Sequence, residues 1–152
     1  MKAVIQRVTQ ASVRIDSVLK GSIQTGLVIL LGIEIPDQVS DAEWLLNKII
    51  KMRIFADQDG KMNHSLLDID GEVLIISQFT LHAMTHKGNR PSFIKAARPE
   101  QATPLYQHFI AQFEALLPGK VQTGEFGADM QVSLTNDGPV TIIIDSKEDE
   151  KL

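Results

Sequence analysis

The 152-residue sequence contains no cysteine, which excludes a disulfide framework and any zinc site built on thiolates. The absence of cysteine favours a reducing compartment, so we expect a cytoplasmic protein. No apolar run approaches the roughly 20 residues of a membrane helix, because the longest extends only from Leu27 to Ile33. Near the N-terminus, Gln6 and Arg7 interrupt the apolar residues before a signal-peptide core could form. These absences predict a soluble protein with no membrane partner.

Acidic residues are absent from segment 73–99, although the net charge of the chain is -4. A negative total argues against a basic nucleic-acid-binding surface over the whole protein, but the charge is unevenly distributed. Segment 73–99 also carries four basic residues, and a solvated loop is one explanation for them. Phosphate binding is the other, because a flexible glycine, a rigid proline and the forked donors of arginine suit phosphate contacts. The candidate phosphate contacts are Lys87, Arg90, Lys95 and Arg98.

Hydrophobic periodicity predicts a mixed α/β chain of one domain, 1–145, followed by a charged tail, 146–152, that we expect to be frayed. The first helix is expected near Ser40, because Ser40 to Glu43 has the spacing of a capping box. The second is expected to have Thr103 as N-cap and Pro104 as its first residue. The apolar run 27–33 predicts a strand buried on both faces. Other strands are expected at 3–9, 12–16, 72–78, 120–123, 130–134 and 140–145.

A Gly-Pro pair, Gly138-Pro139, lies between the last two predicted strands, within the run Asn136 to Thr141. Proline cannot donate to a sheet ladder, so the pair predicts a sharp, rigid backbone excursion there. Bonds that precede proline are also those for which a cis peptide costs little. An ordinary turn between strands is one interpretation. The other is that the carbonyl groups of this excursion are directed at a ligand.

A second motif, Ser77 to Leu81, follows the predicted strand at 72–78 and places two hydroxyls and an amide close together. Strand ends are positions at which polar side chains leave the sheet, and alternation puts Ser77 and Phe79 on one face. Hydroxyl groups at a strand end can also serve only to satisfy the backbone. The motif is therefore a candidate site that needs a second observation.

Together, the motifs Ser77 to Leu81 and Asn136 to Thr141 resemble the paired signature of the D-aminoacyl-tRNA deacylases, the D-tyrosyl-tRNA(Tyr) deacylase family. Two separate motifs in the right order argue against an accidental similarity. We therefore expect a single α/β domain with mixed β-sheets, a barrel-like β core and two main helices packed outside it, in a three-layer α/β/β arrangement. The similarity also covers residues 1–8, 53–55, 60–63, 88–93 and 123–130.

The resemblance implies a homodimeric tRNA-editing hydrolase that uses no cofactor and no metal. Such an enzyme binds aminoacyl-tRNA and cleaves the ester between a D-amino acid and the terminal adenosine, a proofreading step that protects translation. The resemblance further implies that the active site lies at the interface between the two subunits.

Residue roles carried over from the family fall into two groups. In the family the Gly-Pro pair is cis and reaches into the partner's active site, which implies that Gly138-Pro139 rejects L-amino acids. Asn136 and Thr141 flank this pair as candidate substrate-binding residues, and Phe126 and Met130 are expected to contact the adenine. A rigid wall beside the α-carbon leaves no space for an L side chain. Glycine has no side chain to reject, so we expect activity on glycyl-tRNA.

The candidate catalytic residues are Ser77, Gln78, Phe79 and Thr80. Thr80 would be the side-chain nucleophile, but a threonine hydroxyl needs an adjacent base and the motif contains none. The family implies an alternative in which backbone N–H groups near Phe79 bind the oxyanion and the 2′-hydroxyl of the substrate activates water. We favour this alternative, in which Ser77 and Gln78 shape the adenosine pocket.

Other functions have less support in the sequence. His82 and His86 have no third ligand and follow a strand, so we expect loop or surface histidines rather than a metal site. A small-molecule esterase would be expected to carry a Gly-x-Ser-x-Gly elbow, which the chain lacks. A non-catalytic RNA-binding module of the same fold, which would use the basic loop alone, is the remaining alternative.

Overall fold

Two central strands are apolar along most of their length because both of their faces are buried. β3 (Gly26–Gly32) pairs in parallel with β6 (Glu72–Ser77), in a register that runs from Gly26 opposite Glu72 to Leu31 opposite Ser77. Successive side chains point to opposite faces, so Leu27 and Val28 enter two different hydrophobic clusters. The prediction of a strand buried on both faces at 27–33 is confirmed.

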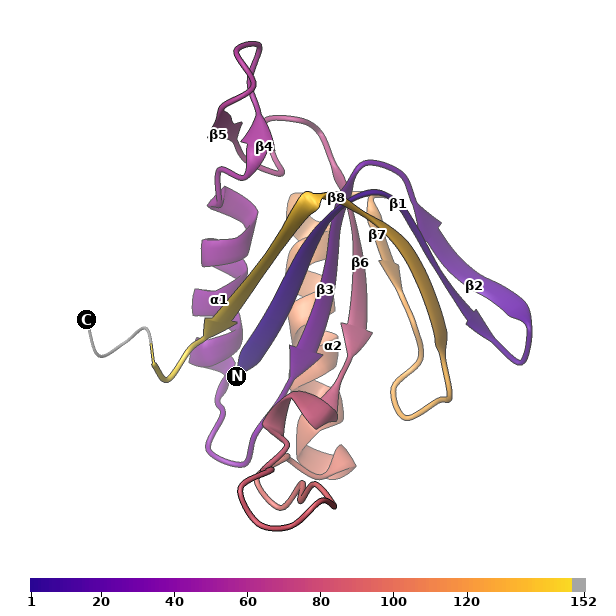
Figure 1. Ribbon diagram of the computed structural model, residues 1–152, viewed down its shortest axis with the longest axis vertical. Helices are drawn as coiled ribbons and strands as arrows, with labels where there is room; N and C mark the ends of the chain where they lie inside the picture. Colours follow the sequence, from indigo (N-terminus) through magenta and orange to yellow (C-terminus); the bar gives the residue numbers. More distant parts are fainter. Residues whose placement is uncertain (149–152) are drawn as a thin grey trace.

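The computed structural model describes residues 1–148, and Figure 1 shows their arrangement. The main sheet has the order β2 (Val18–Ile23), β1 (Lys2–Ile15), β3, β6 and β7 (Val121–Thr123). β8 (Gln131–Asp145) pairs antiparallel with β1. A small separate hairpin consists of β4 (Phe55–Ala56) and β5 (Met62–His64). The sheet is mixed, because β3, β6 and β7 are parallel while β1 pairs antiparallel with its neighbours.

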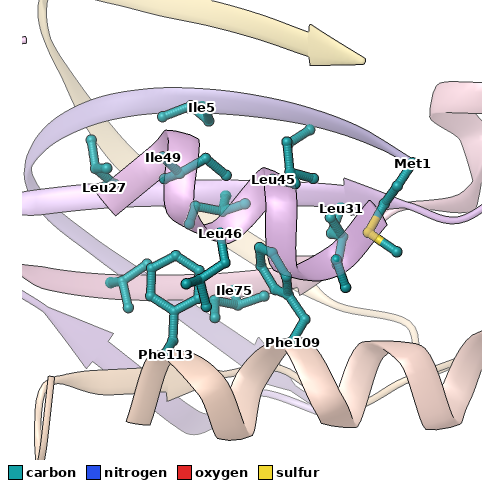
Figure 2. Packing of buried hydrophobic residues seen from close by; sticks show 14 of the residues in the cluster. Met1, Ile5, Leu27, Leu31, Leu45, Leu46, Ile49, Ile75, Phe109 and Phe113 are labelled. Carbon is teal, nitrogen blue, oxygen red and sulfur yellow. The ribbon is translucent and has the colours of Figure 1, made fainter. Parts of the chain in front are cut away.

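Two helices, α1 (Val39–Lys51) and α2 (Pro99–Leu116), cover one face of this sheet (Figure 1). The ring centroids of Phe109 and Phe113 on α2 lie 5.0 Å apart. Figure 2 shows these rings directed toward the apolar side chains of α1 and the strands. The residues that meet in this layer include Ile5, Leu27, Leu31, Leu45, Leu46, Ile49 and Ile75.

The opposite face of the sheet is covered by the sheet itself. β1 and β8 both bend at the top of the view in Figure 1, and the far half of β1 pairs with β2 on one side and with the far half of β8 on the other. Val13 and Ile23 from this curled part pack with Leu74 and Ile76 of β6 in a second cluster. The result is a nearly barrel-shaped β core with helices outside, which confirms the predicted three-layer α/β/β fold.

Several predicted boundaries are wrong because long strands continue through the predicted breaks. Segments 3–9 and 12–16 belong to one strand, β1, and segments 130–134 and 140–145 both belong to β8. The Gly-Pro run is therefore an irregularity within a strand rather than a connection between two strands. When the neighbouring strand is long, it can pair with the bulged strand on both sides of such an irregularity.

Both helices begin earlier than predicted. The N-cap of α1 is Gln38, whose backbone N–H donates to the Asp41 carboxylate at 2.8 Å, so Ser40 is an internal residue. α2 has Pro99 at its first position and contains Pro104. Proline fits the first turn of a helix, where its missing N–H has no intrahelical acceptor. The second proline lies deeper in the helix and costs one backbone hydrogen bond.

The first tail residues are anchored rather than frayed. The Ser146 side chain is buried and donates to Asp41 at 2.8 Å, and the Lys147 ammonium lies 2.7 Å from the same carboxylate. Burial acts to raise the pKa of Asp41, but hydrogen bonds from Lys147, the Gln38 N–H and Ser146 outweigh it and lower the pKa below its ordinary value. The predicted tail is wrong for Ser146 and Lys147, and residues 149–152 lie outside the described residues. Within residues 1–148, no helix is long and apolar enough to span a membrane.

Candidate active site

The motif at the end of β6 forms a tight turn. Parallel pairing with β3 ends at Ser77, and the N–H of Gln78 then donates to the carbonyl of Leu31 at 2.7 Å. The chain continues directly into a 3₁₀ turn, η1 (Phe79–His82). The first N–H groups of a helical turn have no acceptor within that turn. The backbone N–H groups of Phe79 and Thr80 are therefore available to an external acceptor.

Beside this turn lies a cavity of about 260 Å³. One side is lined by Ser77, Gln78 and Phe79, and another by Phe126 and Met130. Further apolar lining comes from Leu31, Ile33, Ile76, Ala97, Ala102 and Val132. The structure thus brings together five of the predicted site residues from two distant parts of the chain. The cavity lining is mostly apolar and includes two polar side chains, those of Ser77 and Gln78.

Phe126 and Met130 are positioned by the segment that follows β7. Gly124 is buried there, and a Cβ atom at this position would collide with the Met130 sulfur, so only glycine permits the close approach. The Phe126 ring lies 5.8 Å from the Tyr106 ring, centroid to centroid. The Tyr106 hydroxyl donates to the carbonyl of Ile75 at 2.9 Å, and burial raises the pKa of Tyr106 to about 12. Tyr106 is a neutral, fixed support beneath Phe126.

Thr80 has a hydrogen-bond donor rather than a base beside its hydroxyl. The amide Nε2 of Gln78 donates to Thr80 Oγ1 at 2.5 Å. An amide nitrogen cannot take the proton that a threonine nucleophile must lose. Thr80 is exposed and does not line the cavity, unlike the other three residues of the predicted catalytic set. This arrangement disfavours a covalent mechanism through Thr80.

The Gly-Pro run forms a wide bulge in β8. Gln6 pairs with Thr141 and Val8 pairs with Asn136, so residues 137–140 all lie opposite Arg7. The peptide between Gly138 and Pro139 is cis, as predicted. Gly138 has a φ of 122°, a backbone conformation that residues with side chains rarely adopt. Residues 137–139 of the bulge are exposed.

Asn136 closes the base of this bulge. Its side-chain oxygen accepts the N–H of Val140 at 3.2 Å, and its side-chain nitrogen donates to the Thr141 hydroxyl at 3.0 Å. The two predicted flanking residues therefore bind one another across the bulge. Within the described chain they do not line the cavity beside Ser77.

Arg7, which was not predicted as a site residue, holds the bulge in place. Its Nε lies 3.2 Å from the carbonyl oxygen of Asp137 and 3.3 Å from the Asp137 carboxylate, and Nη1 donates to the carbonyl of Ile54 at 2.6 Å. The side chain is only 12% exposed. Because its partners are distant in sequence, no local pattern indicates the role of Arg7. Its guanidinium fixes the start of the bulge against the body of the protein.

Within one chain, the bulge and the cavity are far apart. Arg7, which lies opposite the bulge, pairs with Leu27 near the start of β3, whereas Leu31 near the end of β3 lines the cavity; four residues of a strand span roughly 13 Å. The pair Gly138-Pro139 lies near the bend of β8, whereas the cavity lies near the end of β6. The two predicted motifs are therefore not brought together in a single chain.

The basic residues lie on and beside the loop that follows η1, at the bottom of the view in Figure 1. Lys87 and Arg90 are exposed at the tip of the loop, and Lys95 and Arg98 are exposed closer to α2. No acidic residue among the described residues forms an ion pair with any of these four. This end of the molecule therefore carries four basic side chains that form no ion pair with the described acidic residues.

The histidines give no metal site in the part of the chain that the structure describes, since no three His, Asp or Glu side chains gather there. His86 is exposed, as expected. His82 is buried, contrary to the expected surface position, because η1 turns it inward beneath the sheet. Its Nδ1 lies 3.9 Å from the Glu34 carboxylate.

Comparison with known proteins extends over nearly the whole chain. Residues 4–145 match the family model described as D-Tyr-tRNA(Tyr) deacylase. A D-aminoacyl-tRNA deacylase of Flavobacterium psychrophilum is 63% identical over 150 residues, which is 99% of this chain and 100% of the relative. A protein of the same name from Akkermansia muciniphila is 59% identical over the same shares of both chains.

Two solved structures have the same fold. The structure titled c-Myc DNA Unwinding Element Binding Protein has a TM-score of 0.91 and 42% identity, and covers 95% of this chain and 98% of its own. The structure of a probable eukaryotic D-amino acid tRNA deacylase has a TM-score of 0.81 over 94% of this chain and 97% of its own. It is 15% identical, so it supports the fold alone.

The fold, the cavity and these matches together define an enzyme of the hydrolase class. The chain belongs to the D-Tyr-tRNA(Tyr) deacylase family.

Removal of the Asn136 side chain is expected to loosen the bulge. We predict that Asn136→Ala lowers the free energy of unfolding by about 1–2 kcal/mol, because two hydrogen bonds are lost. Amide exchange at Val140 should accelerate, since its N–H loses its acceptor. Ser133→Ala, an exposed change in the same strand, is the control. Unchanged exchange at Val140 in Asn136→Ala would show that the bulge does not depend on this side chain.

Proposed function

We propose that the protein hydrolyses the ester of D-aminoacyl-tRNA to free tRNA and D-amino acid, and that it is a proofreading enzyme of translation. The observation that carries this proposal is the cavity beside the Phe79 turn, in a chain that is similar over its full length to proteins named D-aminoacyl-tRNA deacylase. The cavity supplies an apolar binding space, and the turn supplies backbone donors beside it.

The terminal adenosine of the tRNA is the proposed occupant of the cavity. Phe126 and Met130 offer apolar contacts for a purine ring, and the volume of about 260 Å³ is close to the lower end of the range for small-molecule sites. Ser77 and Gln78 are the polar lining residues, beside which the ribose and the ester would then be located. The support for this assignment is the mixture of lining residues, which are mostly apolar but include Ser77 and Gln78.

For the chemical step, we assign the main role to the backbone. The N–H groups of Phe79 and Thr80 would stabilise the negative charge that develops on the ester oxygen, and such donors each contribute a few kcal/mol. The 2′-hydroxyl of the substrate would activate the attacking water. Thr80 is left without a catalytic role, because its hydroxyl accepts a hydrogen bond from Gln78 and has no base beside it.

Selection between D- and L-amino acids is assigned to Gly138-Pro139 of a second copy of the chain. The distance between the bulge and the cavity within one chain supports this assignment, because one copy cannot supply both parts to one site. The exposed bulge, fixed by Arg7 and Asn136, has the rigidity that a steric wall requires. A homodimer would contain two such composite sites.

A steric wall near the α-carbon is largely insensitive to the identity of a D side chain. An L side chain would collide with the wall, while a D side chain would point toward open space. Glycine would pass, since it lacks a side chain. The proposed enzyme therefore also hydrolyses glycyl-tRNA.

Contacts with the tRNA backbone are assigned to Lys87, Arg90, Lys95 and Arg98. Their positive charge has no acidic partner among the described residues, and they lie on the side of the molecule where the cavity is found. Phosphate contacts of this kind supply affinity that decreases as the salt concentration rises.

A non-catalytic nucleic-acid-binding protein is the second candidate. The 42% identical structure is titled a DNA-unwinding-element-binding protein, and the basic loop would serve either function. The catalytic assignment is favoured because a binding module has no use for a cavity that ends in free backbone donors. Catalysis on D-aminoacyl-tRNA separates the two candidates.

Deacylation assays with matched substrates test the proposal. We expect rapid hydrolysis of D-tyrosyl-tRNA, hydrolysis of glycyl-tRNA at higher enzyme concentration, and no hydrolysis of L-tyrosyl-tRNA above the spontaneous rate. The same side chain on both chiral substrates removes any effect of side-chain recognition. Equal rates on the D and L substrates, or hydrolysis of neither, would contradict the proposed function.

The role of Thr80 is tested by Thr80→Ala. We expect this variant to keep kcat within about tenfold of the wild type, because the lost hydroxyl supplies neither nucleophile nor base. Thr80→Val preserves the shape of the side chain and is the control for packing. A loss of several orders of magnitude in both variants would support a covalent mechanism instead.

A composite site predicts complementation between defective copies. One variant carries Gly138→Val, which disrupts the bulge, and another carries Gly124→Val, which blocks the cavity at Met130. Each homodimer should lack selective activity, whereas co-expressed heterodimers should contain one intact site and reject L-tyrosyl-tRNA while hydrolysing the D substrate. A monomeric mass in solution, or no complementation in a demonstrated heterodimer, would rule out the second copy's role.

A further inference from the structure

The ring of Phe79 packs against the ring of Phe93 in the basic loop. The two centroids are 5.1 Å apart and the planes are inclined by 75°, the edge-to-face geometry that aromatic pairs favour. Phe79 is 55% exposed, so it has little other packing to fix its position. Among the described aromatic rings, Phe93 is its only ring partner. The side chain at the centre of the candidate site is thus supported from the loop.

Phe93 itself is attached on both sides to fixed backbone. On one side, Met84 and Ser92 exchange two hydrogen bonds, at 2.8 and 3.0 Å. On the other side, the Ile35 N–H donates to the Lys95 carbonyl at 3.1 Å, and the Ala97 N–H donates to the Ile33 carbonyl at 2.9 Å. Only the tip of the loop, with Lys87 and Arg90, lies outside these attachments. Phe93 is therefore held in place independently of the tip.

We propose that Phe93 is a positioning residue, which holds the Phe79 turn in the orientation that its backbone donors need and connects that turn to the basic loop. This inference rests on the proposed function. It divides the loop into two parts with separate roles. The tip, with Lys87 and Arg90, binds RNA phosphates, and the part around Phe93 orders the catalytic turn. Phe93 does not line the cavity, so it acts through Phe79 rather than on the substrate.

A split between kcat and KM distinguishes this role from a structural or an RNA-binding role. For Phe93→Ala we expect kcat on D-tyrosyl-tRNA to fall roughly tenfold to a hundredfold, the scale of a small displacement of catalytic groups, with KM within about twofold. The same loss should occur on the minimal substrate D-tyrosyl-adenosine, which has no tRNA stem. Phe93→Tyr keeps the ring and should restore kcat.

Two variants serve as matched comparisons. Ile94→Ala changes an adjacent residue that is 74% exposed, and should leave both constants unchanged. Lys87→Ala at the loop tip should raise KM for the tRNA substrate without lowering kcat, and should have no effect on D-tyrosyl-adenosine. Circular dichroism and thermal unfolding show whether each variant is folded. If Phe93→Ala does not fold, kcat and KM are measured for Phe93→Leu instead, and the same loss of kcat with nearly unchanged KM is expected.

The results that would overturn the role of Phe93 differ from the result that would refute the proposed function. An unchanged kcat in a folded Phe93→Ala or Phe93→Leu variant would overturn it, as would a loss confined to KM or a failure of Phe93→Tyr to restore kcat. An equal loss in Ile94→Ala would also overturn it, because the effect would then belong to the loop in general. A wild-type protein that does not hydrolyse D-tyrosyl-tRNA would instead refute the proposed function itself.

Discussion

The pairing of β1 with β8 is the constraint on which the rest of the structure depends. These two strands pair at both ends of their length, from Lys2 opposite Asp145 to Arg14 opposite Gln131. Their first part lies in the sheet that the helices cover, and their second part curls over the other face. Because one ladder passes through both regions, its register fixes both hydrophobic clusters at once. A slip by one residue would exchange the buried and exposed faces throughout.

The same register determines where the bulge projects. Four residues of β8 opposite the single residue Arg7 can only be accommodated by leaving the ladder; a second register shift follows between Val8 and Gln10, and regular pairing then continues to Arg14. Arg7 and Asn136 then replace the missing ladder bonds with side-chain bonds. A strand is thus able to present a rigid, polar backbone at the protein surface without losing its place in the core.

The extent to which this could be predicted from the sequence differs among the elements. Apolar periodicity was sufficient for β3, whose residues alternate between two buried faces, and for the apolar stripes of both helices, which one helical face explains. It failed where tertiary contacts override local signals. β8 continues through a glycine and a proline because β1 pairs on both sides of them, and Arg7 acquires its partners Asp137 and Ile54 only through folding. Five of the residues that line the cavity were expected at the site through resemblance, but local pattern gave no indication that Phe93 contacts Phe79.

The active site proposed here, which is built from backbone donors, places an unusual demand on the surrounding structure. Side-chain catalysts are adjusted by their electrostatic environment, whereas a backbone N–H has a fixed charge and can be adjusted only by its position. The position of the Phe79 turn follows from contacts outside it: the hydrogen bond from Gln78 to Leu31, the close packing of Gly32 against the turn, and the Phe93 ring. In such a site the residues that matter most for rate need not touch the substrate. On the proposed mechanism, substitution of residues that support the turn is therefore expected to reduce activity more than substitution of polar side chains within the motif.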